Sequence, residues 1–158
     1  MKRSNLQTAL LVEIIDQGYE KSAWHGPNLK QSLRGVSARA AAWRPGRGRH
    51  NIWECALHAA YWKYVVRRRL KGGPRGSFTL PGSNWFASPP TPTEKAWKET
   101  RALLENEHRR LRAAVAGVER SGSRRVAARM IFGAAFHDVY HAGQIRMLRR
   151  LAARGQRG

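Results

Sequence analysis

Apolar residues recur at spacings of three and four along four long stretches of the chain, which is the spacing of an amphipathic α-helix. These stretches run from Asn5 to Gly18, from Asn51 to Lys71, from Thr93 to Val118, and from beyond Ser121-Gly122-Ser123 to Ala152. We find no convincing strand pattern between them. The sequence therefore predicts an all-α protein with four long helices.

Residues at the ends of these stretches match the chemistry of helix termini. Gly18 resembles a glycine that closes a helix at its C-terminus. Asn51 and Glu54 have the spacing of a capping box, and Gly72 follows the same helix. Two shorter helical pieces are predicted between the first two long helices, one from Asn28 to Leu33 and one from Ser37 to Ala42.

The connection from Gly72 to Pro92 decides the topology. A helix of about 20 residues is about 30 Å long, and an extended connection of about 20 residues can span that length. The second and third long helices can then run parallel, which predicts an up-down-down-up four-helix bundle with a long crossover between them. Phe78, Trp85 and Phe86 make this connection too aromatic for a free linker, so we expect it to pack against the helices. At 158 residues the chain fits a single domain, 1–158.

Three histidines lie on the core-facing sides of two predicted helices. His137 and His141 are four residues apart on one helix face, and His58 shares a ridge with Cys55 and Trp62. Each alone is more often a hydrogen-bonded core residue than a ligand. Together they can bind a divalent metal, zinc or nickel first and iron or manganese next, with one coordination position open to water or substrate. The single cysteine, Cys55, excludes an intrachain disulfide and a zinc site built on several cysteines.

Three further residues are candidates for a catalytic role. Gln144 continues the face of His137 and His141, so it could orient His141 or a substrate. Glu54, one turn before His58, could act as a hydrogen-bond acceptor or a proton shuttle, although a capping glutamate is at least as good an interpretation. His25 stands beside Gly26 and Pro27 in a kinked segment of the kind that often lines a pocket.

For four other residues the sequence favours a structural role over a role in the site. We expect Asp138 to bond a neighbouring helix rather than the metal, and Tyr140 to pack as an aromatic residue, although it could instead offer its phenol near the pocket. His50, just before a helix, is expected to assist the start of that helix. His108 is surrounded in sequence by Glu105, Glu107, Arg109 and Arg110, which favours a solvated helix face.

The net charge is +20, from 30 basic and 10 acidic residues. Such a charge favours nucleic acid or another anionic partner, but no helix-turn-helix, zinc-finger or RNP motif accompanies it. Many of the arginines, such as Arg67-Arg68-Arg69, stand near predicted helix C-termini, where they complement the helix dipole. The apolar run from Ala9 to Val12 stops at Glu13, too short for a signal peptide core or a membrane span. We therefore expect a cytoplasmic protein with no membrane partner.

The segments FHDVYHAGQI, NIWECALHAAYW and AWHGPNL resemble the DinB/YfiT-like superfamily of metal-binding four-helix-bundle proteins. The resemblance covers nearly the whole chain and implies that His58, His137 and His141 bind a divalent metal. It also implies an up-down-down-up bundle, frequent homodimers, and members that use low-molecular-weight thiols as transferases or isomerases.

Two functions from different classes follow. The first is a metal-dependent enzyme that acts on a small-molecule substrate, as a thiol-dependent S-transferase or as a hydrolase. The alternative is a basic nucleic-acid-binding or stress-related protein in which the metal site is structural. Salt-resistant binding to arbitrary duplex DNA would favour the second.

Overall fold

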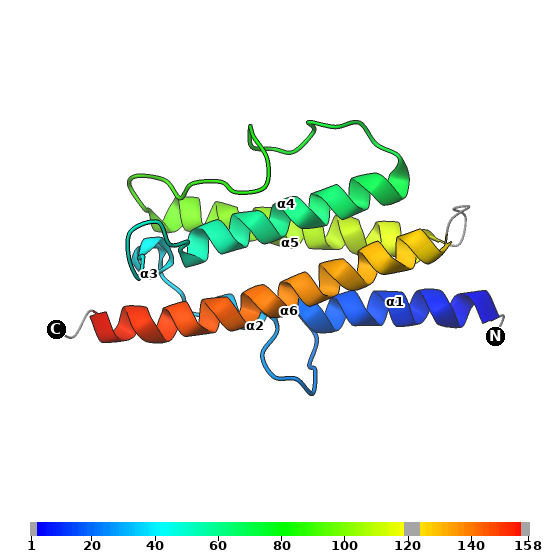
Figure 1. Cartoon of the computed structure of the whole chain (residues 1–158), viewed down its shortest axis with the longest axis horizontal. Helices are drawn as coiled ribbons and strands as arrows, with labels where there is room; N and C mark the ends of the chain where they lie inside the picture. Colours follow the sequence, from blue (N-terminus) through cyan, green and yellow to red (C-terminus); the bar gives the residue numbers. More distant parts are fainter. Residues whose placement is uncertain (1–2, 119–123, 156–158) are drawn as a thin grey trace.

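The computed structural model describes residues 3–118 and 124–155, and within those residues it contains α-helices and loops (Figure 1). The four long helices are α1 (Arg3–Tyr19), α4 (Ile52–Lys71), α5 (Glu94–Ala116) and α6 (Arg124–Gly155), and the two short ones are α2 (Leu29–Leu33) and α3 (Ala38–Ala42). The predicted all-α class is confirmed, and each predicted helix has a counterpart. The predicted Ser121-Gly122-Ser123 connection lies outside the described residues.

The helix ends follow from the residues found there. The side chain of Asn51 accepts a hydrogen bond from the backbone N–H of Glu54 (2.9 Å), which fixes the start of α4. Gly72 ends α4 with φ of 71°, in the left-handed region that glycine adopts without strain. The prediction for Gly18 is wrong, because α1 continues to Tyr19. Gly18 instead lets α1 approach α6, since a Cβ there would lie 2.9 Å from the carbonyl oxygen of Ala135.

Contacts between the long helices give their relative directions. Trp53 and Trp97 meet near the N-terminal ends of α4 and α5, with ring centroids 5.0 Å apart. Further along the same two helices Arg67 pairs with Glu107 at 3.1 Å. Helices α4 and α5 therefore run parallel, and the segment 72–93 returns along their length in Figure 1.

Apolar side chains from all the helices fill the space between them. One group of buried residues joins α2, α3 and the first half of α4 to the first half of α5 and the second half of α6, and it includes Tyr19 from the end of α1. Another joins the rest of α1 and Val66 of α4 to the remaining halves of α5 and α6. Phe86 from the long connection is buried in the first group. The expectation that this connection packs down is therefore confirmed.

A buried polar cluster crosses the centre of the helices. The Lys63 ammonium on α4 pairs with Asp138 on α6, and both side chains are almost fully buried. On its other side Lys63 Nζ lies 3.5 Å from Nδ1 of His108 on α5. The helix-bonding role expected for Asp138 is thus confirmed.

The predicted solvated position of His108 is wrong. Its side chain is fully buried and stacks on the ring of Tyr19, with centroids 4.1 Å apart. Desolvation, reinforced by the nearby charge of Lys63, lowers the pKa of His108 to about 2. His108 is therefore a neutral core residue at physiological pH.

None of the helices in residues 3–118 and 124–155 combines the length and the apolar character that a membrane crossing requires.

Candidate metal centre

Three imidazole nitrogens converge between α4 and α6. His58 comes from α4, and His137 and His141 come from successive turns of α6. Nε2 of His137 lies 3.1 Å from Nε2 of His58 and 3.1 Å from Nε2 of His141. A metal ion about 2.0–2.1 Å from each nitrogen separates its ligands by about 2.9 Å at right angles and about 3.3 Å at tetrahedral angles. The observed spacing lies between these values, so the three nitrogens fit one divalent ion.

The surroundings keep these rings neutral, as metal ligands must be. Desolvation together with its two histidine neighbours lowers the pKa of His137 to about 3. Desolvation and His58 lower the pKa of His141 to about 4, and desolvation also lowers that of His58. Neutral imidazole nitrogens that face one another at this distance are a donor set suited to zinc or nickel.

Asn84, on the segment between α4 and α5, sets the orientation of His58. Its carbonyl oxygen accepts a hydrogen bond from Nδ1–H of His58 (2.8 Å), so Nε2 of His58 presents its lone pair to the other two histidines. Asn84 has φ of 66°, and its side-chain oxygen accepts a hydrogen bond from Trp62 Nε1 (3.1 Å). Asparagine tolerates this left-handed conformation better than most residues. Trp62 and Asn84 thus hold His58 from outside the site.

Trp85 forms the second support of His58. Its indole stacks on the His58 ring at 3.8 Å between centroids with an interplanar angle of 7°. His50 stacks on Trp85 at 3.6 Å and 4°. Three flat rings from two loops and a helix therefore stand in one column at the edge of the site. The sequence does not predict a site role for Trp85 or Asn84, because a loop without periodicity gives no indication of which helix face it covers.

Gln144 lies where its helix phase placed it, one turn beyond His141. Its Nε2 donates a hydrogen bond to the hydroxyl of Tyr140 (3.0 Å). Desolvation lowers the pKa of His141 overall, and the interaction with Gln144 opposes part of that effect. Tyr140 itself is 62 % exposed, so the prediction that it is a packed aromatic residue is wrong. The pair instead forms a polar edge beside His141.

Glu54 forms its side-chain contacts with the loop before α4. Its carboxylate pairs with the Arg44 guanidinium and lies 2.9 Å from Nδ1 of His50. Burial raises the pKa of Glu54, but the hydrogen bonds from Arg44 and His50 outweigh that effect and hold it below its ordinary value. Glu54 is therefore an ionised anchor for Arg44 and His50 rather than a direct acceptor for His58.

A cavity of about 720 Å³ opens above the three histidines. We call it the histidine cavity. Cys55 reaches it from α4, and burial raises the pKa of that thiol to about 12, so the thiol is protonated at neutral pH. The exposed His25, on the loop between α1 and α2, is not part of its lining, so the pocket role expected for His25 is not found here. The remaining walls mix cations, amides and apolar groups: Pro45, Gly48, Arg49, His50, Trp85, Tyr140, Gln144, Met147 and Leu148.

A second group of ligand-type side chains, Asp16, Glu20 and His108, is close enough to hold an ion. Its hydrogen bonding argues against one. Lys63 approaches Nδ1 of His108 as a donor, so Nε2 of the neutral ring carries the proton and has no lone pair for a metal. Asp16 is already paired with Arg112 at 3.0 Å. Asp16 and Glu20 are therefore engaged in ion pairs and His108 is neutral, so the group is not a rival metal site.

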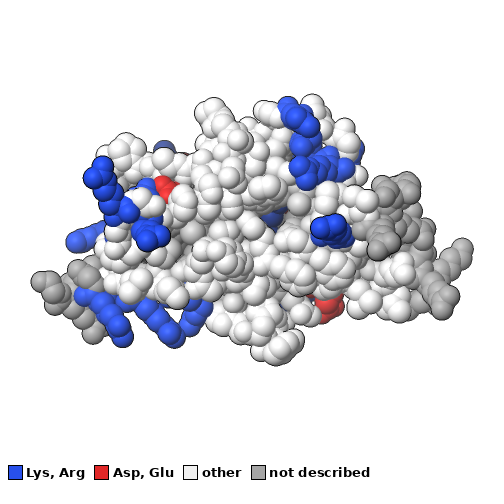
Figure 2. Space-filling view, viewed as in Figure 1, with Lys and Arg blue, Asp and Glu red and all other residues white. Residues whose placement is uncertain are grey.

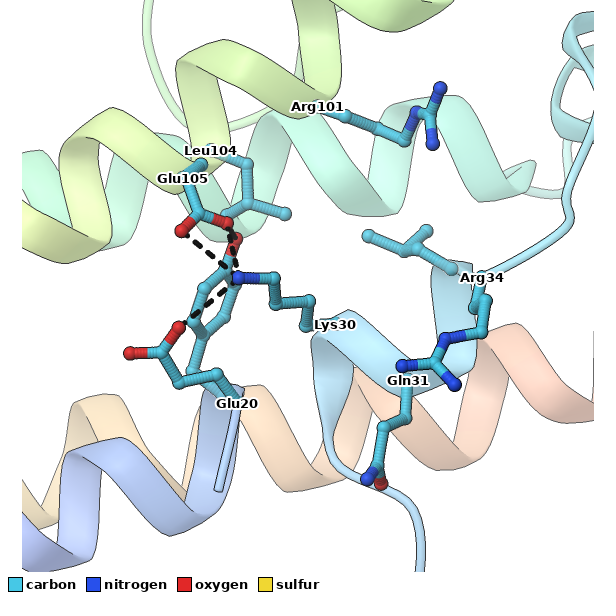
Figure 3. A pocket seen from close by; sticks show the side chains of 9 residues that line it. Glu20, Lys30, Gln31, Arg34, Arg101, Leu104 and Glu105 are labelled. Carbon is cyan, nitrogen blue, oxygen red and sulfur yellow. Dashed lines mark hydrogen bonds and ion pairs between the residues drawn. The ribbon is translucent and has the colours of Figure 1, made fainter. Parts of the chain in front are cut away.

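Another cavity, of about 480 Å³, lies between α1, α2 and α5 (Figure 3). Lys30 bridges Glu20 and Glu105 in it, at 3.1 and 3.0 Å. Arg34 and Arg101 stand across the space from this triad (Figure 3). Lys30 already pairs with both carboxylates, so the cavity offers no strong position for a metal cation.

An all-helical chain with three neutral histidines converging from two helices defines a class of candidate metalloproteins. The sequence profile of the DinB superfamily matches residues 23–145, a span that includes all three histidines. This chain belongs to the DinB superfamily. No curated protein and no solved structure shows a significant match to it.

Proposed function

We propose that this DinB-superfamily protein is a divalent-metal-dependent enzyme that uses His58, His137 and His141 to hold its metal and acts as a thiol-dependent S-transferase or a hydrolase. The observation that carries the proposal is the convergence of three neutral Nε2 atoms beneath a cavity large enough for a small-molecule substrate. When bound, a divalent cation at this position supplies Lewis-acid chemistry that lowers the pKa of a water or a thiol.

The other residues of the histidine cavity have roles that follow from their contacts. Asn84 and Trp85 fix the ring of His58, and Gln144 restrains Tyr140 at the cavity edge. Trp85 and Leu148 give the cavity an apolar wall, and the exposed Met147 lies at its edge. Arg49 supplies a positive charge at the same cavity, which suits a substrate or thiol that carries a carboxylate.

Metal analysis tests the centre directly. Wild-type protein purified without an affinity tag should carry about one equivalent of divalent metal per chain, because three histidine ligands suffice for tight binding. The double variant His58→Ala/His141→Ala should carry almost none, whereas His25→Ala should match the wild type. Equal and negligible metal in all three proteins would overturn the proposal.

Activity assays separate the two reactions. Metal-loaded protein should either couple a low-molecular-weight thiol to an electrophile or hydrolyse an ester or amide without a thiol. The first result assigns the transferase and the second assigns the hydrolase. Metal binding without either activity would favour the structural metal site of the alternative function, and saturable duplex DNA binding near physiological salt would support it further.

We also propose that two chains associate through the face that α1 and α6 share. Both helices carry large exposed apolar side chains, and a monomeric protein rarely leaves a large contiguous apolar patch uncovered. Light scattering should give the mass of a dimer, and Phe136→Glu should give that of a monomer. The large exposed apolar residues of these two helices are Leu6, Leu10, Val126, Phe132, Phe136, Tyr140, Met147 and Leu151.

Two finer assignments complete the proposal. We assign the four long helices to an up-down-down-up four-helix bundle, with support from the parallel pairing of α4 and α5 and the returning segment 72–93. The cytoplasmic location inferred from the sequence stays a prediction.

A further inference from the structure

A second hollow, which Trp62 helps to line, lies beside the candidate metal centre. It has a volume of about 490 Å³ and lies between the C-terminal half of α4 and the segment that follows. We call it the arginine hollow. Its lining combines three arginines with three aromatic side chains and contains no carboxylate: Tyr61, Trp62, Tyr64, Val65, Arg68, Arg69, Arg75, Gly76 and Asn84.

The charge around this hollow is positive and uncompensated. The sequence contains no Asp or Glu between Glu54 and Glu94. Among the described residues neither Arg69 nor Arg75 forms an ion pair, and the one hydrogen bond found for the Arg68 side chain goes to the carbonyl of Gly73 (3.4 Å). Figure 2 shows Lys and Arg side chains gathered over this end of α4, with no acidic side chain visible among them.

Helix electrostatics explain only part of this charge. Arg68, Arg69 and Lys71 lie in the last turn of α4, where cations complement the helix dipole. Arg75 lies beyond the helix, yet it faces the same hollow. The segment that carries Arg75 is anchored, because the backbone N–H of Ser77 donates a hydrogen bond to the Tyr64 hydroxyl (3.0 Å). Arginines from the helix and from the anchored segment therefore line one space.

We propose that the arginine hollow is a binding site for the phosphate group of a small anionic molecule. Guanidinium groups present several N–H donors in a planar fork that matches the oxygens of a phosphate, and several arginines can bind one such group together. The partly buried aromatic walls lower the local dielectric and strengthen the attraction. The hollow shares Trp62 and Asn84 with the supports of His58, so a bound anion lies next to the candidate metal centre.

Calorimetric titration with inorganic pyrophosphate near physiological salt tests the site in the full-length protein. We expect one saturable site per chain in the wild type. Arg69→Ala/Arg75→Ala should weaken binding by at least about tenfold, because two charge-assisted contacts are lost. The matched control is Arg39→Ala/Arg109→Ala, which removes the same charge from two exposed helix positions outside the hollow and should change the affinity less than twofold.

Two further measurements, with a His141→Ala variant and with duplex DNA, distinguish the proposed site from other sources of pyrophosphate binding. Pyrophosphate can also bind a metal ion, so His141→Ala serves to separate the two sites, and it should leave the pyrophosphate affinity unchanged. Loss of binding in His141→Ala, or equal losses in the two arginine pairs, would overturn the proposal. An absence of saturable pyrophosphate binding to the wild type would overturn it as well. Tight binding of duplex DNA in that case would assign the arginines to an extended nucleic-acid surface.

Discussion

Replacing Lys63 by methionine should destabilise the protein strongly, because the substitution leaves Asp138 buried without its cation. The two side chains are 2 % and 1 % exposed, so water cannot take over the lost interaction. Lys63 also lies 4.7 Å from the centre of the Tyr19 ring and 3.5 Å from His108. Breaking one partner of a buried pair costs about 3–5 kcal/mol, and we expect Lys63→Met to lie in that range.

A double-mutant cycle isolates the interaction. Asp138→Asn alone should also be costly, because it leaves a buried ammonium group. The double variant Lys63→Met/Asp138→Asn should be more stable than the sum of the two single effects predicts, by at least about 2 kcal/mol. Lys30→Met is the matched control. Lys30 also contacts two carboxylates, but its side chain is 49 % exposed, so its loss should cost no more than about 1 kcal/mol.

Urea unfolding followed by circular dichroism provides the measurement, with a chelator present so that metal binding does not contribute to stability. Similar losses for Lys63→Met and Lys30→Met would refute the reasoning, because burial is the property that distinguishes the two lysines. Strict additivity in the cycle would refute it as well, since it would mean that Lys63 and Asp138 do not interact.

Three other predictions concern pH, packing and metal affinity. The pKa of His108 is about 2 in the folded protein and about 6.5 when unfolded, so the unfolded chain binds the proton first as pH falls. The free energy of unfolding should therefore drop below about pH 6.5, by up to about 1.4 kcal/mol per pH unit, and His108→Gln should reduce that slope in acid titrations of stability. Gly18→Ala should lower stability by about 1–3 kcal/mol in urea unfolding, because its Cβ meets the Ala135 carbonyl, whereas Gly133→Ala has open space and should be neutral or stabilising. Trp62→Phe should weaken zinc binding by about tenfold or more in competition with a chromogenic chelator, since it removes a support of the His58 orientation, and an unchanged affinity would contradict that role.

Helix phase was sufficient to bring the three histidines together, because His58, His137 and His141 each fall on the apolar face of a long, strongly periodic helix. The same argument, applied to His108, would have placed it correctly. Leu104 and Leu111 stand four residues before and three residues after it, and both are fully buried. The incorrect interpretation came from its charged sequence neighbours, which on a helix point in other directions.

The supports of the site were not predictable in the same way. Asn84 and Trp85 belong to a connection without regular structure, and their positions depend on how the whole segment packs over α4. The sequence indicated only that aromatic residues there would be buried. The role of Glu54 likewise depends on Arg44, whose loop has no periodic pattern to place it.

The ring column of His50, Trp85 and His58 gives this protein a built-in spectroscopic probe. An indole in face-to-face contact with two imidazoles experiences their ring currents and any change in their charge. The chain has six tryptophans, and fluorine-labelled tryptophan would give each its own NMR resonance. Trp85 is the one that stacks directly on a proposed ligand, so its resonance should report occupation of the centre without any change to the three histidines.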